Sequence, residues 1–306
     1  MHKSVLFDES IEALNIRPDG IYIDGTFGRG GHSQEILNRL GQNGRLYAFD
    51  KDPDAIRHSK EIFADEKRFV IVQDSFGNLK KNTDLWSITH KVDGILLDLG
   101  VSSPQLDDAS RGFSFLRDGP LDMRMNPDAG LSAAEWLAHE KESEIVRVLK
   151  VYGEERYAKR IAKAIVTARD ESELTSTKQL ADVVAAAHPA WEKHKHPATR
   201  AFQAIRIFIN EELSDVELCL PQSLEVLTIG GRLVVISFHS LEDRIVKRFI
   251  QKNVKGDEFP VDLPVMNSAL KQKLKKIGKL ITPSDQEIGE NPRARSAKLR
   301  VAALVA

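Results

Sequence analysis

A short apolar run at residues 21–23 leads into four glycines within seven residues, namely Gly25, Gly28, Gly30 and Gly31. Glycine is needed where the backbone takes a positive φ or comes very close to a ligand, because a Cβ atom would collide there. The residues that follow, 33–40, carry apolar side chains at helical spacing. This pattern predicts a strand, a ligand-binding loop and a helix whose first N–H groups face the ligand.

The spacing of the loop narrows the class of ligand. A dinucleotide fingerprint is G-x-G-x-x-G, whereas this loop is G-x-x-G-x-G-G and directly follows Asp24. A carboxylate at that strand end disfavours a pyrophosphate but suits an ammonium group, such as that of S-adenosylmethionine. A second predicted strand, residues 45–49, ends in Asp50, which is placed to bind ribose hydroxyls. The loop favours a methyltransferase over a dehydrogenase, and a purely structural glycine turn stays open.

Length and composition indicate a protein of two domains in a reducing compartment. The chain has 306 residues, of which 42% are hydrophobic and 29% charged, as in ordinary soluble proteins. The single cysteine, Cys219, allows no internal disulfide, which fits the cytoplasm. Asp8 and Glu9 stand where a signal peptide needs an apolar core, and no apolar stretch approaches the ~20 residues of a membrane span. We therefore expect a cytoplasmic protein without a membrane partner.

Charge is unevenly distributed along the chain. Residues 239–306 hold 14 Lys/Arg against 8 Asp/Glu, a balance of +6, whereas the whole chain has a net charge of −1. A polyanion could dock on this basic C-terminal part. The alternative is that the lysines between residues 271 and 279 form a solvated helix surface.

Two further strand patterns, residues 69–73 and 92–97, are followed by Phe76 and Asp98. Alternating strands and helices predict a doubly wound, Rossmann-like α/β fold, in which ligands bind outside the carboxyl ends of parallel strands. Asp24, Asp50 and Asp98 all lie at such ends, which indicates an enzyme. Phe76 is a candidate to cover an adenine ring, although an aromatic residue after a strand can equally belong to the core.

The next strong strand pattern, residues 232–236, begins more than 130 residues after Asp98. A crossover needs only a dozen or so residues, so an inserted all-α domain is predicted at residues 107–197. Residues 1–106 and 198–306 would then form the sheet domain. At its end, residues 279–281 and 297–304 are predicted to pair as antiparallel strands that close the sheet.

The segment after the fourth strand is where methyltransferases that act on amino groups keep a polar-Pro-Pro-aromatic motif, which Ser103-Pro104 matches only in part. An exocyclic amine is a poor nucleophile because its lone pair is delocalised into the ring, so the enzyme must position it and accept its hydrogens. Asp98, Ser102 and Ser103 are the candidate catalytic acceptors. A simple Ser-Ser-Pro turn is the alternative.

Arginines interleaved with aromatic residues follow between residues 110 and 125. A guanidinium can bind phosphate and a ring can stack on an unpaired base, so these residues are candidate RNA contacts. His239, at the end of another strand, is a further candidate for the substrate, although a lone histidine is often structural. The candidate substrate-binding residues are Arg111, Phe113, Phe115, Arg124 and His239. A packed linker between two domains is the alternative for this segment.

Six stretches together resemble one family along the whole chain: GTFGRGGH (25–32), LLDLGVSSPQLD (96–107), RGFSF (111–115), DMRM (122–125), SFHSLED (237–243) and NPRARS (291–296). They are similar to the RsmH/MraW family of bacterial small-subunit ribosomal RNA cytosine-N4 methyltransferases. The resemblance implies a class I methyltransferase sheet, S-adenosylmethionine as the methyl donor, and a cytidine in the ribosomal decoding region as the acceptor. It also implies that the inserted helical domain recognises the substrate.

The resemblance places the cofactor contacts at matching motif positions: Gly30, Gly31, His32, Asp50, Phe76, Asp98 and Gln105. The loop pattern adds Asp24 and Gly28, and no metal site is expected. The expected partner is small-subunit ribosomal RNA within the assembled subunit, with naked RNA and a homodimer left open. Two other classes stay open: a nicotinamide oxidoreductase, which Asp24 and the loop spacing disfavour, and a cofactor-free RNA-binding assembly factor, which leaves the strand-end acids unexplained.

Overall fold

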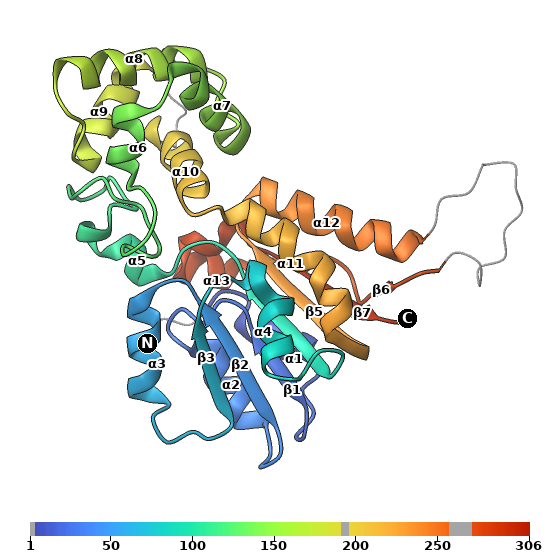
Figure 1. Cartoon of the computed structure of the whole chain (residues 1–306). Coiled ribbons are helices and arrows are strands. Elements are labelled where there is room, and N and C mark those ends of the chain that lie inside the picture. The colour runs from blue at the N-terminus through green and yellow to red at the C-terminus, as the bar shows by residue number, and fades with distance from the viewer. Residues whose placement is uncertain (1–3, 191–195, 257–270) are drawn as a thin grey trace, which may run out of the picture. The chain divides into compact units, whose positions relative to one another are not determined.

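The computed structural model describes residues 4–190, 196–256 and 271–306. The chain forms two compact units, each described here by itself (Figure 1). The sheet unit comprises Met1–Gly100 and Leu213–Ala306, and the helical unit comprises Val101–Glu212. An insertion into a sheet domain is thus present, but its boundaries differ from the expected 107–197.

The sheet unit is built on seven strands: β1 (Ile21–Asp24), β2 (Arg45–Asp50), β3 (Phe69–Gln73), β4 (Val92–Asp98), β5 (Leu227–Ser237), β6 (Leu274–Lys276) and β7 (Lys298–Leu304). Their order in the sheet is β3-β2-β1-β4-β5-β7-β6. The first five strands pair in parallel, whereas β7 is antiparallel to both β5 and β6. The predicted fold class, a mostly parallel Rossmann-like sheet with an antiparallel C-terminal strand, is confirmed.

Helices cover both faces of this sheet. Side chains alternate along a strand, so Leu96 of β4 joins the core on one face while Ile95 and Leu97 join the core on the other. The first face is covered by α1 (Phe7–Leu14), α2 (Gly31–Arg39) and α3 (Pro53–Ile62). The second is covered by α4 (Leu79–Leu85), α11 (Glu212–Val226) and α12 (Ser240–Lys255). Both faces of the central strands are therefore buried, which explains their continuous apolar sequence.

Two expectations about the sheet unit need correction. The strand beside β7 is Leu274–Lys276, whereas residues 279–281 contribute only an isolated bridge between Ile281 and Leu299. Lys275 and Lys276 accordingly lie on an edge strand and not on a helix. Helix α1 packs on a face of the sheet, because Leu14 lies against Gly94 of the central strand β4. The turn region before β7 contains α13 (Asp285–Glu290) and the 3-10 segment Pro292–Ser296.

The helical unit contains α5 (Ser103–Asp107), the 3-10 segment Ala109–Arg111, α6 (Ala133–His139), α7 (Glu142–Gly153), α8 (Ala158–Glu171), α9 (Thr177–Ala187) and α10 (Ala198–Ile209). Ser132 and Ser176 form capping boxes at the starts of α6 and α9. Helix α10 belongs to this unit because Phe202 and Ile205 are buried in its core. Its fit against α7 is close: a Cβ at Gly153 would lie 2.7 Å from the carbonyl oxygen of Arg200.

None of the helices in the described ranges is both long and apolar enough to cross a membrane.

Candidate active site

The carboxyl ends of the parallel strands bring three aspartates to one edge of the sheet. Asp24 ends β1, Asp50 ends β2 and Asp98 ends β4. The chain runs outward from β1 through β2 to β3 and then returns to β4 on the other side of β1, so the strand order reverses between β1 and β4. In an open α/β sheet the crevice at such a reversal is where ligands bind.

The glycine loop after β1 has the conformation that its sequence predicted. Gly28 and Gly30 have φ values of 55° and 76°, in the left-handed region that favours glycine. Gly30 is also closely packed, because a Cβ there would lie 2.8 Å from the ring of Phe27. At Gly25 a Cβ would lie 2.4 Å from Leu97 Cδ2. Glycine therefore suits the loop between β1 and α2 at each of these positions, through a positive φ at Gly28, a close approach at Gly25 and both at Gly30.

Asp50 is held in one orientation by the loop. Its Oδ2 accepts a hydrogen bond from the backbone N–H of Gly28 at 2.8 Å, and its Oδ1 accepts one from the N–H of Asp52 at 2.8 Å. Burial raises the pKa of Asp50 to about 6, against the lowering effect of these two hydrogen bonds. Since a carboxylate has about four lone-pair sites, acceptor capacity remains for two hydroxyls.

Both carboxylate oxygens of Asp24 accept a hydrogen bond within the sheet unit. Its Oδ2 accepts a hydrogen bond from the Ser33 hydroxyl at 2.7 Å, and its Oδ1 accepts one from the N–H of Thr26 at 3.1 Å. Burial raises the pKa of Asp24 to about 6. The residue ties the end of β1 to the start of α2, and its expected contact with the cofactor stays a prediction.

Asp98 and His32 face each other with unused hydrogen-bonding atoms. Asp98 Oδ2 lies 3.8 Å from His32 Nδ1, while Asp98 Oδ1 and His32 Nε2 are buried and have no hydrogen-bond partner among the described residues. The Asp98 backbone is fixed, because its N–H donates to the Thr26 hydroxyl at 2.7 Å. The His32 ring stacks on Phe7 at 5.3 Å between centroids. Buried polar atoms of this kind normally have partners, so they point to a polar ligand.

The pKa values of this pair are shifted in opposite directions. Burial, and to a lesser extent the nearby carboxyl groups of Asp24 and Glu242, together raise the pKa of Asp98 to about 8. Burial lowers the pKa of His32 to about 4. At neutral pH the two groups are therefore mostly uncharged and do not form an ion pair. A cationic ligand beside Asp98 would favour its ionised form.

The end of β5 is organised around a buried glutamate that the sequence did not single out. Glu242 Oε2 accepts hydrogen bonds from the backbone N–H groups of Phe238 at 2.9 Å and His239 at 3.2 Å. In return, His239 Nδ1 accepts one from the N–H of Glu242 at 3.4 Å, which caps α12. This capping explains why a histidine stands here, and the expected substrate contact of His239 stays a prediction.

Phe76 follows β3 and opens a 3-10 segment, Phe76–Asn78. Its side chain is half-buried against the core on the second face of the sheet. It also lies beside the loop, since a Cβ at Gly25 would be 3.4 Å from Phe76 Cβ. Both expectations for this residue, a core position and a place at the ligand edge, are compatible with this location.

Three candidate site residues lie at the start of the helical unit. Ser102 caps α5, and Gln105 completes a capping box by accepting a hydrogen bond from the Ser102 N–H at 2.9 Å. Gln105 is buried, whereas Ser102 and Ser103 are half-buried. The Ser-Ser-Pro segment is thus the capped start of a short helix, and the catalytic and cofactor roles of these residues stay predictions.

The loop predicted to contact RNA uses its side chains within the helical unit. Arg111 donates to the carbonyl oxygens of Arg124 and Met125, and Arg124 makes a two-pronged pair with Asp122 at 2.9 and 2.6 Å. Phe113 is buried, and the ring of Phe115 packs on Phe202 at 4.8 Å. These contacts agree with a packed linker, so phosphate and base contacts of these residues stay predictions.

Comparison with known proteins decides the family. The sequence profile of the MraW methylase family matches residues 1–305. The chain belongs to the MraW methylase family. The curated relatives include ribosomal RNA small subunit methyltransferase H of Coxiella burnetii (strain RSA 331 / Henzerling II), 59% identical over 98% of this chain and 97% of that protein. The protein of the same name from Nitrosococcus oceani is 60% identical over 98% of this chain and 96% of its own length.

Solved structures similar to this family member are more distant. An rRNA methylase from Streptococcus thermophilus is 11% identical with a TM-score of 0.46, covering 100% of this chain and 99% of that one. A SAM-dependent O-methyltransferase from Thermotoga maritima is 11% identical with a TM-score of 0.43, covering 100% of this chain and 68% of that one.

Proposed function

We propose that this member of the MraW methylase family transfers a methyl group from S-adenosylmethionine to the exocyclic N4 amine of a cytidine in the decoding region of small-subunit ribosomal RNA. Family membership supports the methyl-transfer chemistry, and the curated relatives are named for small-subunit ribosomal RNA. The cytidine and its location follow from the motif resemblance of the sequence. Because the proposed substrate is ribosomal RNA, we propose the cytoplasm as the compartment of the reaction.

One structural observation carries the assignment of the cofactor site. Asp98 and His32 offer unpartnered buried polar atoms at the point where the strand order reverses, beside a glycine loop and an oriented Asp50. This set fits a ligand with a cationic group and a ribose: Asp98 for the cation, Asp50 for the ribose hydroxyls. When bound, S-adenosylmethionine supplies a reactive methyl group on its sulfonium.

The residues of the chain then have to position the amine and remove its proton. Asp98 is the foremost candidate, because an ionised carboxylate can accept a hydrogen bond from the amine and a pKa near the working pH suits a proton acceptor. Ser102 and Ser103 stay the alternative acceptors. Asp98 can serve the amine, the cofactor or both, and the sequence and the structure support each role.

Asp98→Asn separates these roles. If Asp98 serves the amine, turnover falls strongly while the dissociation constant for S-adenosylmethionine changes little, since the amide loses charge and half its acceptor capacity. If it holds the cofactor, turnover and affinity fall together. Wild-type values for both would leave Asp98 as a residue that only shapes the turn.

The function itself is tested with radiolabelled methyl donor and three substrates: naked small-subunit ribosomal RNA, assembled small subunits and whole ribosomes. We expect label in at least one of them, and nuclease digestion followed by chromatography should recover it as N4-methylcytidine. Label in another nucleoside, or in none of the three substrates, contradicts the proposal.

We also propose that the helical unit recognises the substrate. The sheet unit carries the strand-end aspartates, so the inserted unit is free to bind the parts of the RNA that do not react. Substitutions confined to its helices α6–α10 should then raise KM for RNA without changing the affinity for S-adenosylmethionine.

A further inference from the structure

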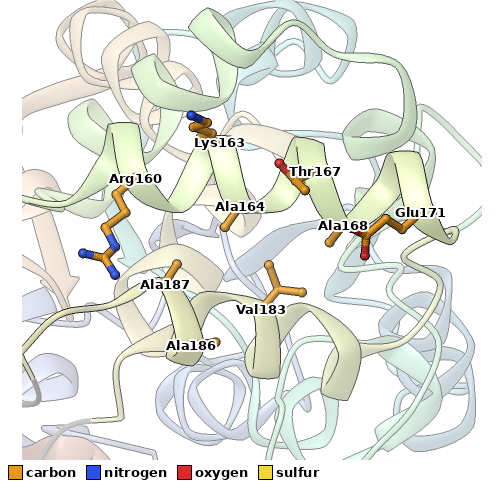
Figure 2. A pocket seen from close by; sticks show the side chains of 9 residues that line it. All are labelled: Arg160, Lys163, Ala164, Thr167, Ala168, Glu171, Val183, Ala186 and Ala187. Atoms are coloured by element: carbon orange, nitrogen blue, oxygen red, sulfur yellow. The ribbon is translucent and has the colours of Figure 1, made fainter.

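A groove of about 460 Å³ lies between α8 and α9 of the helical unit (Figure 2). Its floor consists of small apolar side chains: Ala164, Ala168, Val183, Ala186 and Ala187. Because these side chains are short, the space between the two helices stays open, and a flat group can lie against the floor. None of the nine side chains that line the groove is aromatic.

The ends of the groove differ in charge. Arg160 and Lys163 line it toward one end of α8, Glu171 lies at the other end, and the Thr167 hydroxyl lies between them (Figure 2). Lys159 is a further exposed cation, four residues before Lys163 and hence its neighbour on the helix surface. Two lysines and an arginine are thus displayed within about one turn of helix.

These cations differ from Arg147 and Arg124 of the same unit, each of which has an acidic partner. Arg147 pairs with Glu144, and Arg124 pairs with Asp122. Within the described part of the chain, neither Arg160 nor Lys163 makes an ion pair or a side-chain hydrogen bond. Exposed cations that no acid neutralises, next to a hollow, indicate a partner that is itself anionic.

We propose that this groove docks a single-stranded or loop segment of the substrate RNA other than the reacting cytidine; this rests on the proposed function. Arg160 and Lys163 bind successive phosphates, and the alanine floor receives the face of a base or sugar. Because aromatic stacking partners are missing from the lining, the groove reads the backbone and its shape and not a particular sequence. It holds no group that could take part in methyl transfer, so it acts as an anchor.

The test removes charge from the groove and, separately, fills it. Arg160→Gln with Lys163→Gln removes two cations. The matched control, Lys141→Gln with Lys150→Gln, removes two exposed cations of α7 and its cap that do not line the groove. Ala186→Trp occupies the groove without a change in charge at an exposed position. Thermal unfolding confirms that each variant is folded.

The readouts are RNA affinity at several salt concentrations, KM and kcat with assembled small subunits, and the dissociation constant for S-adenosylmethionine. The double groove variant should raise KM for the subunit roughly tenfold. The slope of log RNA affinity against log salt concentration should become less steep by about 1.4, because two contacts to the phosphates of a single strand are lost. Ala186→Trp should raise KM as well, whereas kcat and cofactor affinity stay unchanged in both. The control should change KM less than about twofold.

A photo-crosslinking amino acid in place of Thr167 identifies what lies in the groove of the enzyme bound to assembled subunits. Crosslinks to ribosomal RNA support the proposal. Crosslinks to subunit proteins alone, or none above those of the same probe at Lys150, overturn it. Groove variants that match the control in KM overturn it too, and wild-type methylation in that same assay shows that the proposed function still holds.

Discussion

Binding of the methyl donor should release a proton from Asp98. The pKa of this residue is raised to about 8 by burial and by neighbouring carboxyl groups, so at pH 7 its protonated and ionised forms stand at about 10 to 1. A cation beside the carboxyl group favours the ionised form and lowers that pKa. If the bound pKa falls well below 7, each binding event releases about 0.9 proton at pH 7 and about 0.1 at pH 9.

The same linkage fixes the pH dependence of affinity. Since the ligand binds the ionised form, affinity should rise with pH until the pKa of the free enzyme is reached. For a pKa of about 8 the expected gain between pH 6 and pH 8 is roughly fiftyfold. Asp24 and Asp50 have pKa values of about 6, so any protons that they release on binding add to the pH dependence of affinity only near pH 6 and below.

Calorimetry in buffers of different ionisation enthalpy measures the protons released. Asp98→Asn is the matched control, because it keeps the shape of the side chain and every other titrating group, including the amino group of the ligand. We expect the wild type to release about 0.9 proton more than this variant at pH 7. Equal release by the two proteins would refute the reasoning, since Asp98 would then keep its proton in the complex.

Three further predictions concern the loop, the ribose contact and the RNA. Asp50→Ala should weaken S-adenosylmethionine binding about ten- to a hundredfold through loss of a charge-assisted hydrogen bond, and an unchanged dissociation constant in a folded variant contradicts this. Gly30→Ala should lower the free energy of unfolding by about 2–4 kcal/mol, because of backbone strain and a clash with Phe27. Gly28→Ala should lower it by only about 1–2 kcal/mol, because the nearest atom to the added Cβ is 4.0 Å away. Chemical denaturation measures both values. RNA affinity should fall with added salt while cofactor affinity barely moves; equal salt dependence of both would count against phosphate contacts.

The sheet could be predicted because its signals are local. Apolar runs ending in aspartate, and glycines at the turn after β1, are dictated by burial on two faces and by backbone conformation. The position of β6 could not be predicted in this way. An edge strand of three residues, Leu274–Lys276, has one buried side chain and two exposed lysines, and it is defined by its pairing with β7. The boundary at α10 likewise depends on which core receives Phe202, and the apolar pattern of that helix fits either unit.

The site could be predicted only as a set of residue types at strand ends. The groups that orient these residues lie in other parts of the chain. The Ser33 hydroxyl donates a hydrogen bond to Asp24, and the Thr26 hydroxyl accepts one from the Asp98 N–H. The carboxyl group of Glu242 contributes to the raised pKa of Asp98. Nothing in the spacing of the motifs shows these partners. For Arg111 and Arg124 the sequence could not separate an RNA contact from an internal one. A guanidinium group binds a phosphate, a backbone carbonyl or a carboxylate equally well, and here the partners are backbone carbonyls and Asp122.

The raised pKa of Asp98 connects cofactor binding with the chemistry of the acceptor. Under the proposed function, Asp98 would lose its proton when positive charge arrives in the site, and it would then be an acceptor when the amine has to be held. In the proposed reaction the positive charge of the donor would pass to the methylated amine, which then carries a surplus proton. Asp98 would accept that proton, and with the cation gone the pKa of Asp98 would return toward its value of about 8 in the free enzyme, which favours keeping the proton on the carboxyl group. A carboxyl group that burial holds close to neutral pH can thus perform both roles in turn, whereas a solvated aspartate, with a pKa of about 3.9, would bind a cation but would be a poor proton acceptor.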